Sequence, residues 1–214
     1  MREVSDELVA IGRTLSTASL HEACGRRGAL PSAIKPVARS MRLCGRALPV
    51  NCPPGDNLWL HHAIYEARRG DILVADTGEA SEFGYWGEVM TVAAIERGLG
   101  GLVISGGIRD ADRLASLGFP VFSGAICIRG TAKDPASPGS IGAAVRLSDV
   151  TVHAGDLVLG DADGVLVVAA EDAAEALHEA ARRDEAEVRI FERLRAGETT
   201  LRVYQLPALE LRSA

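Results

Sequence analysis

Between residues 70 and 123 the chain alternates short apolar runs with amphipathic segments, and this alternation restricts the fold more than any other sequence feature. Strands are expected in GDILVAD (70–76), GLVISGG (101–107) and FPVFS (119–123), and helices in GEVMTVAAIERG (87–98) and RDADRLASLG (109–118). Strands and helices that alternate over such short connections are typical of a parallel α/β sheet. The right-handed crossover rule predicts that both helices cover the same face of that sheet.

Further elements are expected on both sides of this βαβ core. Ahead of it we expect a short helix capped by Ser16 or Thr17 (16–25), a strand (41–50) and a second helix (58–67). After it we expect a long loop rich in Pro, Gly and Ser (131–142), several short strands divided by Gly-Asp and Asp-Gly turns (143–169) and a long charged helix (171–197). A single domain over residues 1–214 is the default for this length. The charge of the last helix fits either a contact between subunits or a solvated face.

The composition excludes several classes of protein. The 23 Lys and Arg against 29 Asp and Glu give a net charge of −6 with no concentrated basic patch, which argues against a nucleic-acid-binding surface. The four cysteines contain no C-x-x-C pair, so neither a zinc knuckle nor a dithiol redox centre is indicated, and they fit small reduced core residues. No signal sequence and no run of ~18 apolar residues are recognisable, so a soluble, cytoplasmic protein without membrane contact is expected.

Charged residues gather where the predicted strands end. Arg109 and Asp110 directly follow the strand 101–107, and the carboxyl ends of parallel strands form the rim where open α/β sheets bind their ligands. Twenty residues separate Glu88 from Arg109, which fits one helix plus one strand. Glu88 is therefore expected to return beside the Arg109-Asp110 pair, so that two carboxylates and a guanidinium share one rim.

This set of groups suits a hard divalent cation and a small 2-oxo acid. Mg²⁺ takes oxygen ligands, keeps several waters and needs only one or two carboxylates, so Asp110 is a candidate direct ligand and Glu88 a candidate ligand through water. Backbone N–H groups of Gly87, Glu88 and Val89 at the helix start can hold a substrate carboxylate. Arg109 can then face the oxygen that becomes negative in an enolate.

The same residues have a simpler interpretation. An Arg-Asp pair at a helix start is often a solvated salt bridge with a capping carboxylate, and Glu in a first helical turn complements the helix dipole. The residue types alone favour neither interpretation. The glycine-rich segment 98–107 matches neither a dinucleotide fingerprint nor a phosphate loop, so NAD, ATP and S-adenosylmethionine are unsupported.

Several segments resemble the RraA-like family, in particular its class II pyruvate aldolases, which act on 4-hydroxy-4-methyl-2-oxoglutarate and 4-carboxy-4-hydroxy-2-oxoadipate. The spacing of Glu88, Arg109 and Asp110 is similar to the family's acidic-X20-Arg-Asp pattern. Five other segments that look like these enzymes occur in the same order: HEACGRRG (21–28), PPGDNLWLHHA (53–63), GYWGE (84–88), GFPVFS (118–123) and GDLVLGDADGVLVV (155–168).

The resemblance implies a β/β/α swivelling-domain fold in trimers or hexamers, with active sites between subunits and dependence on Mg²⁺ or Mn²⁺. It implies that Asp110 binds the metal directly, Glu88 binds it through water, Arg109 stabilises a pyruvate enolate, and the backbone of 87–89 cradles the substrate. The implied reaction is retro-aldol cleavage of a 4-hydroxy-2-oxo acid to pyruvate and a second oxo acid, with oxaloacetate decarboxylation as a related activity.

Two further features bear on this resemblance. Ser105 and Gly106 stand where many of these aldolases are expected to carry Asp-Gly or Asp-Ala, which concerns the substrate pocket more than the metal site. Another branch of the family consists of non-catalytic regulators that bind an RNA-processing enzyme. Members of that branch tend to lack the acidic residue after the arginine, so Asp110 favours an enzyme.

Overall fold

The alternation predicted for residues 70–123 is present in the computed structural model, which describes residues 3–78 and 80–209. The elements of this core are β3 (Ile72–Asp76), β4 (Gly84–Trp86), α4 (Glu88–Arg97), β5 (Gly101–Ile108), α5 (Ala111–Leu117) and β6 (Val121–Ile126). Every strand and helix expected here forms, and β4 is an additional short strand. Residues 1–2, 79 and 210–214 of the predicted domain 1–214 lie outside the described range.

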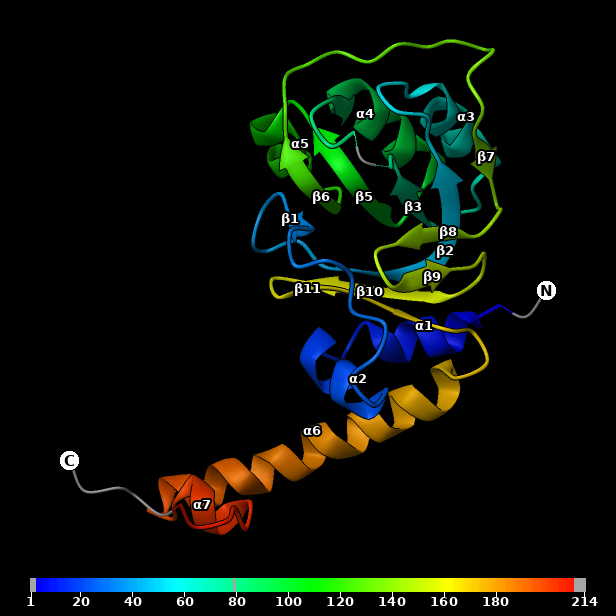
Figure 1. Ribbon diagram of the computed structural model, residues 1–214. Helices are drawn as coiled ribbons and strands as arrows, with labels where there is room; N and C mark the ends of the chain where they lie inside the picture. Colours follow the sequence, from blue (N-terminus) through cyan, green and yellow to red (C-terminus); the bar gives the residue numbers. More distant parts are fainter. Residues whose placement is uncertain (1–2, 79, 210–214) are drawn as a thin grey trace.

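One curved sheet organises the protein, with the strand order β1-β6-β5-β3-β2-β10-β11. β2 (Leu43–Asn51) and β10 (Leu157–Asp161) pair antiparallel, as do β10 and β11 (Gly164–Val168), whereas β2, β3, β5 and β6 run parallel to one another. β1 (Lys35–Pro36) pairs antiparallel with β6, and Ala29 just ahead of it bridges to Leu166 of β11. The two edges of the sheet therefore approach each other, and the sheet is nearly closed (Figure 1).

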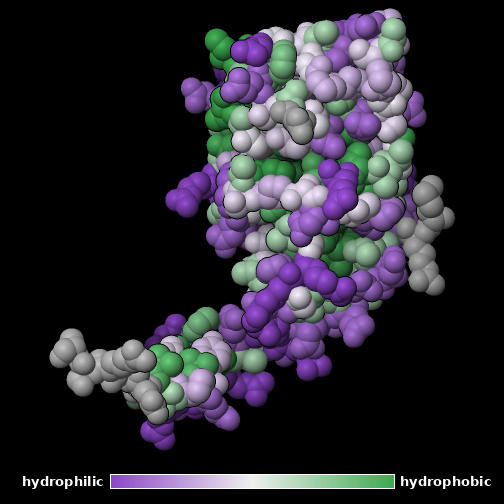
Figure 2. Space-filling view, in the orientation of Figure 1, coloured by the Kyte–Doolittle hydropathy of each residue, from purple (hydrophilic) through white to green (hydrophobic). Residues whose placement is uncertain are grey.

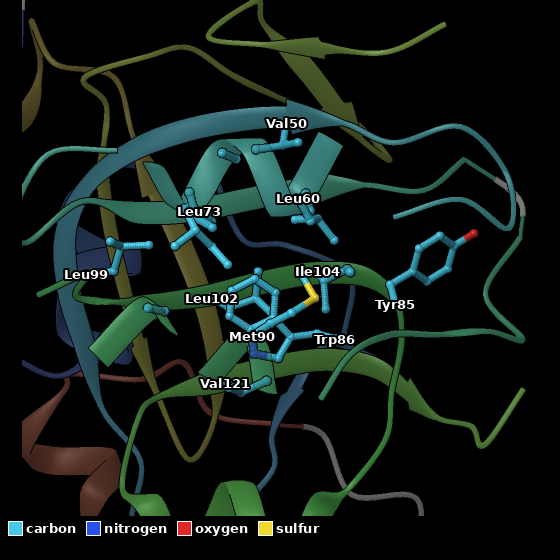
Figure 3. Close-up of a cluster of buried hydrophobic side chains, with 14 of the residues drawn as sticks. Val50, Leu60, Leu73, Tyr85, Trp86, Met90, Leu99, Leu102, Ile104 and Val121 are labelled. Atoms are coloured by element: carbon cyan, nitrogen blue, oxygen red, sulfur yellow. The ribbon is translucent and has the colours of Figure 1, made fainter. Parts of the chain in front are cut away.

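Three helices cover the outer face of the parallel strands, as the crossover rule predicts. α3 (Leu58–Glu66), α4 and α5 all contribute to one buried cluster with β3 and β5. Figure 3 shows Trp86 and Met90 packed close to Leu102 and Val121 in this cluster. Burying such large apolar side chains is the main favourable term that holds these helices on the sheet.

The remaining elements build two further clusters. The hairpin of β8 (Val145–Leu147) and β9 (Val150–Val152) covers the inner face of the sheet, where Val74, Val103 and Phe122 are buried. On the far side of β10 and β11, α1 (Asp6–Gly12), α2 (Thr17–Ala23) and the start of α6 (Ala173–Arg195) form the third cluster (Figure 1). Ser16 caps α2 as predicted, because its hydroxyl accepts a hydrogen bond from the Ser19 amide at 3.0 Å.

The long charged helix predicted near the C-terminus is α6, and it extends away from the rest of the protein as an arm (Figure 1). Its buried residues, Ala173, Ala176, Leu177 and Ala180, all lie in its first turns. α7 (Thr200–Val203) follows at the end of the arm and contacts α6. Within residues 3–78 and 80–209, no helix has both the length and the apolar character needed to cross a membrane.

The predicted loop 131–142 is largely irregular, as expected, but it contains the two-residue strand β7 (Ser140–Ile141), which pairs antiparallel with the end of β2. The Trp59 indole donates a hydrogen bond of 3.1 Å to the Ser137 carbonyl, which ties this segment to α3. The long loop therefore runs across the carboxyl ends of the strands and is anchored at both a strand and a helix.

Candidate functional site

The candidate site lies where β4 passes into α4 and β5 passes into α5. The end of β4 pairs in parallel with the end of β5, with Trp86 opposite Ile108. The pairing extends one residue further, because the Arg109 amide donates a hydrogen bond of 2.8 Å to the Trp86 carbonyl. Glu88 thus leaves the sheet beside Arg109 and Asp110, and the structure brings the three charged residues together.

The Asp110 side chain caps the neighbouring helix rather than its own. Its backbone has φ 58° and ψ 34°, a left-handed conformation that Asp tolerates better than most side chains. Its carboxylate makes no capping bond within α5, whereas Oδ2 accepts a hydrogen bond of 3.0 Å from the Glu88 amide, the first residue of α4. The simple interpretation of Asp110 as a cap of its own helix is therefore wrong, and the carboxylate is directed across to α4.

Gly87 leaves the space that this contact needs. A Cβ atom at Gly87 would lie 2.5 Å from Oδ2 of Asp110 and 3.2 Å from Cγ of Arg109. The backbone of Gly87 is extended, with φ −156°, so other residues could adopt it, and the requirement for glycine is one of space. The Gly87 carbonyl accepts hydrogen bonds of 3.0 Å from both the amide and the hydroxyl of Thr91, which fixes the first turn of α4.

Alternating charges link the ends of the two helices. Arg109 Nε lies 3.8 Å from Oδ2 of Asp110, and both side chains are substantially exposed, at 50% and 40%. Oε1 of Glu88 accepts from Arg113 of α5, whose Nε and Nη2 atoms lie at 3.1 and 3.0 Å. Sequence reasoning missed Arg113, which lies on α5, the helix that begins directly after Asp110. The four charges compensate one another, and the exposed Arg109 remains accessible to an incoming anion.

The predicted backbone cradle is partly occupied by protein groups. The Glu88 amide is bound to Asp110, while the amides of Gly87 and Val89 have no hydrogen-bond acceptor in the described part of the chain. The Val89 side chain is 78% exposed, so this turn of α4 faces solvent. Unpaired N–H groups at a helix start favour an anionic ligand.

Ser105, the position where this sequence departs from the expected pattern, ties the end of β3 to β5. Its hydroxyl accepts a hydrogen bond of 2.9 Å from the Thr77 amide and lies 3.3 Å from Oδ1 of Asp76, to which it donates. Asp76 already supplies a carboxylate at this point, so an Asp in place of Ser105 would put two like charges in contact. A small hydroxyl satisfies both the neighbouring amide and the neighbouring carboxylate.

Tyr85 joins two loops beside the site. It is fully buried, and Figure 3 shows its hydroxyl pointing away from the apolar cluster. This hydroxyl accepts a hydrogen bond of 2.7 Å from the Gly55 amide and donates one of 2.9 Å to the Ala80 carbonyl. The Asn57 side chain donates to the Tyr85 carbonyl at 2.7 Å. Burial is the largest influence on the Tyr85 phenol and raises its pKa, which keeps the hydroxyl protonated as a donor.

The residues at the site fit a hard divalent cation that keeps most of its waters. Asp110 and Glu88 each use one carboxylate oxygen in the hydrogen bonds described above, so Oδ1 of Asp110 and Oε2 of Glu88 remain for a ligand. No group of three or more His, Cys, Asp or Glu side chains suited to a metal occurs in the described residues. Two carboxylates with water completing the shell suit Mg²⁺ or Mn²⁺ better than Zn²⁺.

A large cavity lies away from this site. It measures about 830 Å³ and is bordered by α2, β11 and the first turns of α6, with Cys24, Arg27 and His153 among its lining residues. None of the predicted site residues lines it. We place the candidate site at the strand ends in spite of this, because the charged groups with free donors and acceptors converge there.

Comparison with known proteins decides the family. Residues 3–167 match the model of the RraA-like family, described as Aldolase/RraA. The chain belongs to the RraA-like family. A relative in Halalkalibacterium halodurans named "Putative 4-hydroxy-4-methyl-2-oxoglutarate aldolase" is 32% identical over 168 residues, which are 78% of this chain and 79% of the relative. The predicted resemblance is therefore confirmed, together with the mixed α/β fold and its long C-terminal helix.

Solved structures support the same assignment to the RraA-like family. An uncharacterized protein from Pseudomonas syringae superimposes with a TM-score of 0.80 and 26% identity, covering 93% of this chain and 97% of that one. A structure titled as the RNA-processing inhibitor RraA from Thermus thermophilis has a TM-score of 0.65 and 25% identity, covering 72% of this chain and 92% of that one. The family thus contains proteins with aldolase names and proteins with inhibitor names.

Proposed function

We propose that this RraA-like protein is a divalent-metal-dependent aldolase that cleaves a 4-hydroxy-2-oxo diacid to pyruvate and a second oxo acid. The observation that carries the proposal is the contact between Asp110 and the start of α4, which sets a carboxylate, an exposed guanidinium and unpaired amides side by side. The aldolase names of the relatives agree with lyase chemistry.

In the proposed reaction the C3–C4 bond of the substrate breaks as the 4-hydroxyl loses its proton. The electron pair of that bond moves toward the 2-oxo oxygen and gives the enolate of pyruvate, while C4 becomes the carbonyl of the second product. In this proposal the exposed Arg109 guanidinium stabilises the negative oxygen, and protonation at C3 completes pyruvate. Decarboxylation of oxaloacetate passes through the same enolate and is proposed as a related activity.

Asp110 would hold the metal ion through its remaining oxygen, and Glu88 would hold one of the metal's waters. When bound, Mg²⁺ or Mn²⁺ supplies a Lewis acid that polarises the 2-oxo group. The amides of Gly87 and Val89 bind the substrate carboxylate in this proposal. Exposure of the Arg109 and Asp110 side chains leaves the site open to a small 2-oxo acid.

The direct test is pyruvate release from 4-hydroxy-4-methyl-2-oxoglutarate and from oxaloacetate, measured with and without Mg²⁺ after treatment with a chelator. We expect activity that requires the metal and is lost in Arg109→Gln. Asp112→Asn, which neutralises an exposed carboxylate on the adjoining α5, is the control and should retain activity. Full activity in chelator would refute the metal dependence.

A second candidate function is a non-catalytic regulator that binds an RNA-processing enzyme. The similarity to the Thermus structure titled as an RNA-processing inhibitor favours it. The discriminating pair of observations is capture of an RNA-processing enzyme together with no pyruvate release from either substrate. Pyruvate release that requires Arg109 would decide in favour of the aldolase.

We also propose that the chain assembles as a homotrimer or homohexamer in the cytoplasm. The support is the arm, where Val188, Phe191, Leu201 and Tyr204 are exposed. Figure 2 shows apolar residues gathered at the far end of this arm. Apolar side chains grouped on an extended element are usual at subunit contacts and costly in contact with water.

A further inference from the structure

A second site with unpaired charges lies at the opposite edge of the sheet. Gly70 precedes β3 and Gly100 precedes β5, so this edge carries the amino ends of the parallel strands, whereas Arg109 and Asp110 follow a carboxyl end. A pocket of about 350 Å³ opens here beside α1. Three arginines line it, Arg13, Arg46 and Arg69, and Asp6 is the only carboxylate in its lining.

The Arg69 guanidinium lies against a glycine that lines the same pocket. A Cβ atom at Gly98 would lie 2.8 Å from Nη1 and 3.1 Å from Cζ of Arg69, so only glycine leaves room for the guanidinium in this position. Gly98 also ends α4 in a left-handed conformation with φ 72°, which glycine adopts without steric cost. Gly98 therefore ends α4 and also leaves space for the Arg69 guanidinium.

Arg46 forms the inner wall of the pocket. Its side chain is only 16% exposed, and Nη1 donates to the Val4 carbonyl at 3.2 Å and to the exposed carboxylate of Asp6 at 2.6 Å. Its Nε lies 3.6 Å from Oδ1 of Asp71, and both atoms are buried without a hydrogen-bond partner. Arg46 is thus fixed in place while one of its donors remains unsatisfied.

The other two arginines have no protein partner. In residues 3–78 and 80–209, neither Arg13 nor Arg69 makes an ion pair or a side-chain hydrogen bond. Asp6 and Asp71 both face Arg46, so they offset its charge, and Glu3 pairs with the adjacent Arg68. Asp71 also lies 3.5 Å from Arg68. Two unpaired guanidinium groups therefore remain around one small pocket, whose lining carries three arginines and one carboxylate.

We propose that this pocket binds a phosphate group, either of free inorganic phosphate or of a small phosphorylated metabolite. A dianion matches the two unpaired arginines, whereas a single carboxylate would leave one of them without a partner. The planar guanidinium fork matches phosphate oxygens in a bidentate manner. The volume of about 350 Å³ accommodates a phosphate or a compact phosphomonoester.

The test is isothermal titration calorimetry of the full chain with inorganic phosphate near neutral pH, at an ionic strength held constant with chloride. We expect one saturable site per chain. The double variant Arg13→Gln/Arg69→Gln should weaken binding by about 100-fold, because each of the two charge-assisted contacts contributes roughly a factor of ten. The exposed Arg39→Gln removes one charge outside the pocket and should bind as the unmodified protein does.

Two further measurements distinguish the possible outcomes of this test. Arg109→Gln should bind phosphate normally, and loss of binding in that variant alone would assign the anion to the candidate active site and overturn the proposal. Absence of saturable binding, or equal binding by the double variant, would also overturn it. A titration with glycerol 3-phosphate separates the two sources of the group: tighter binding than inorganic phosphate indicates a metabolite, and weaker binding indicates free phosphate.

Discussion

The amide of Glu88 donates its hydrogen bond to Oδ2 of Asp110, so one carboxylate both caps α4 and faces the proposed metal position. Changes at Asp110 are therefore expected to affect both stability and the proposed activity. An isosteric amide separates the two roles, because Asn can still accept from the Glu88 amide and tolerates the left-handed backbone.

We expect Asp110→Asn to fold with nearly unchanged stability and to lose activity by at least about 100-fold, because a neutral amide binds a divalent cation poorly. Asp110→Ala should lose activity equally and also cost about 1 kcal/mol of unfolding free energy, because the cap of α4 is gone. Urea unfolding and pyruvate release measured on the same samples check both expectations. Equal stability of the two variants would contradict the capping role.

Gly87→Ala tests the space beside Asp110. The new Cβ would sit 2.5 Å from the carboxylate oxygen and push it away from the Glu88 amide, so we expect a loss of activity of roughly 100-fold, as small displacements of catalytic groups produce. Gly130→Ala is the matched control, since a Cβ atom there meets nothing within 4 Å. Steady-state kinetics at several Mg²⁺ concentrations distinguish weakened metal binding from a misplaced Arg109. Unchanged activity in Gly87→Ala would show that Asp110 need not hold its position.

Arg113→Gln tests whether Arg113 competes with the proposed metal-bound water for the Glu88 carboxylate. Arg113 neutralises the carboxylate that we assign to a metal-bound water, so its removal should lower the Mg²⁺ concentration for half-maximal activity by about two- to fivefold, the strength of an exposed ion pair. Arg189→Gln removes the same charge from the exposed face of α6 and should leave the Mg²⁺ dependence unchanged. A higher Mg²⁺ requirement in Arg113→Gln would instead show that Arg113 orients Glu88.

Asp161 provides a pH-dependent contribution to stability. Burial raises the pKa of this carboxyl, but hydrogen bonds from the amide and hydroxyl of Thr17 and from the Asp163 amide outweigh it, and the net pKa lies below the ordinary value of 3.8. The ionised form therefore stabilises the fold fully above pH 3.8, and this stabilisation is lost as the pH falls further through the lowered pKa. We expect Asp161→Asn to lower the free energy of unfolding by about 1–3 kcal/mol at neutral pH.

Urea unfolding of Asp161→Asn and of the unmodified protein, followed from neutral pH down through the acid range, checks this. The difference between their free energies of unfolding should stay constant until the pH approaches 3.8 and should become smaller below it. A difference that is already narrowing at neutral pH would mean that the carboxyl titrates higher than its hydrogen bonds imply.

The exposed apolar residues of the arm give a test of assembly. Val188→Ser combined with Phe191→Ser should shift the protein toward smaller species in multi-angle light scattering, because both side chains are about half exposed in the isolated chain. Glu192→Ser, an exposed polar change on the same helix, should leave the mass unchanged. An unchanged mass in the double variant would exclude these residues from the subunit contact.

Much of the core could be predicted because local patterns alone encode it. The segments that become β3, β5 and β6 are mostly apolar or small residues, and the helices between them both end at glycines, Gly98 and Gly118. The antiparallel pairing of β2 with β10 joins segments more than a hundred residues apart, and no local pattern reveals it. β4 has three residues, two of them aromatic, and becomes a strand only because the end of β5 offers a partner.

The proximity of Glu88, Arg109 and Asp110 could be predicted, but the contacts that connect them could not. The interval between Glu88 and Arg109 equals one helix plus one strand, which correctly predicted their proximity. The turn of Asp110 toward α4 depends on its left-handed backbone, and the pairing of Arg113 with Glu88 depends on how α4 and α5 face each other. Both are tertiary properties that residue types do not reveal.

The segment 127–139 crosses the carboxyl ends of the strands, yet the three charged residues of the site are carried by the sheet and the two helix starts. Its anchors are the Trp59 indole, β7 and a hydrogen bond of 2.8 Å from the Gly84 amide to the Arg129 carbonyl. Residues between these anchors can be changed without altering β4, β5 or the hydrogen bond from the Arg109 amide to the Trp86 carbonyl. The segment is therefore a practical starting point for directed changes of substrate in the proposed aldolase.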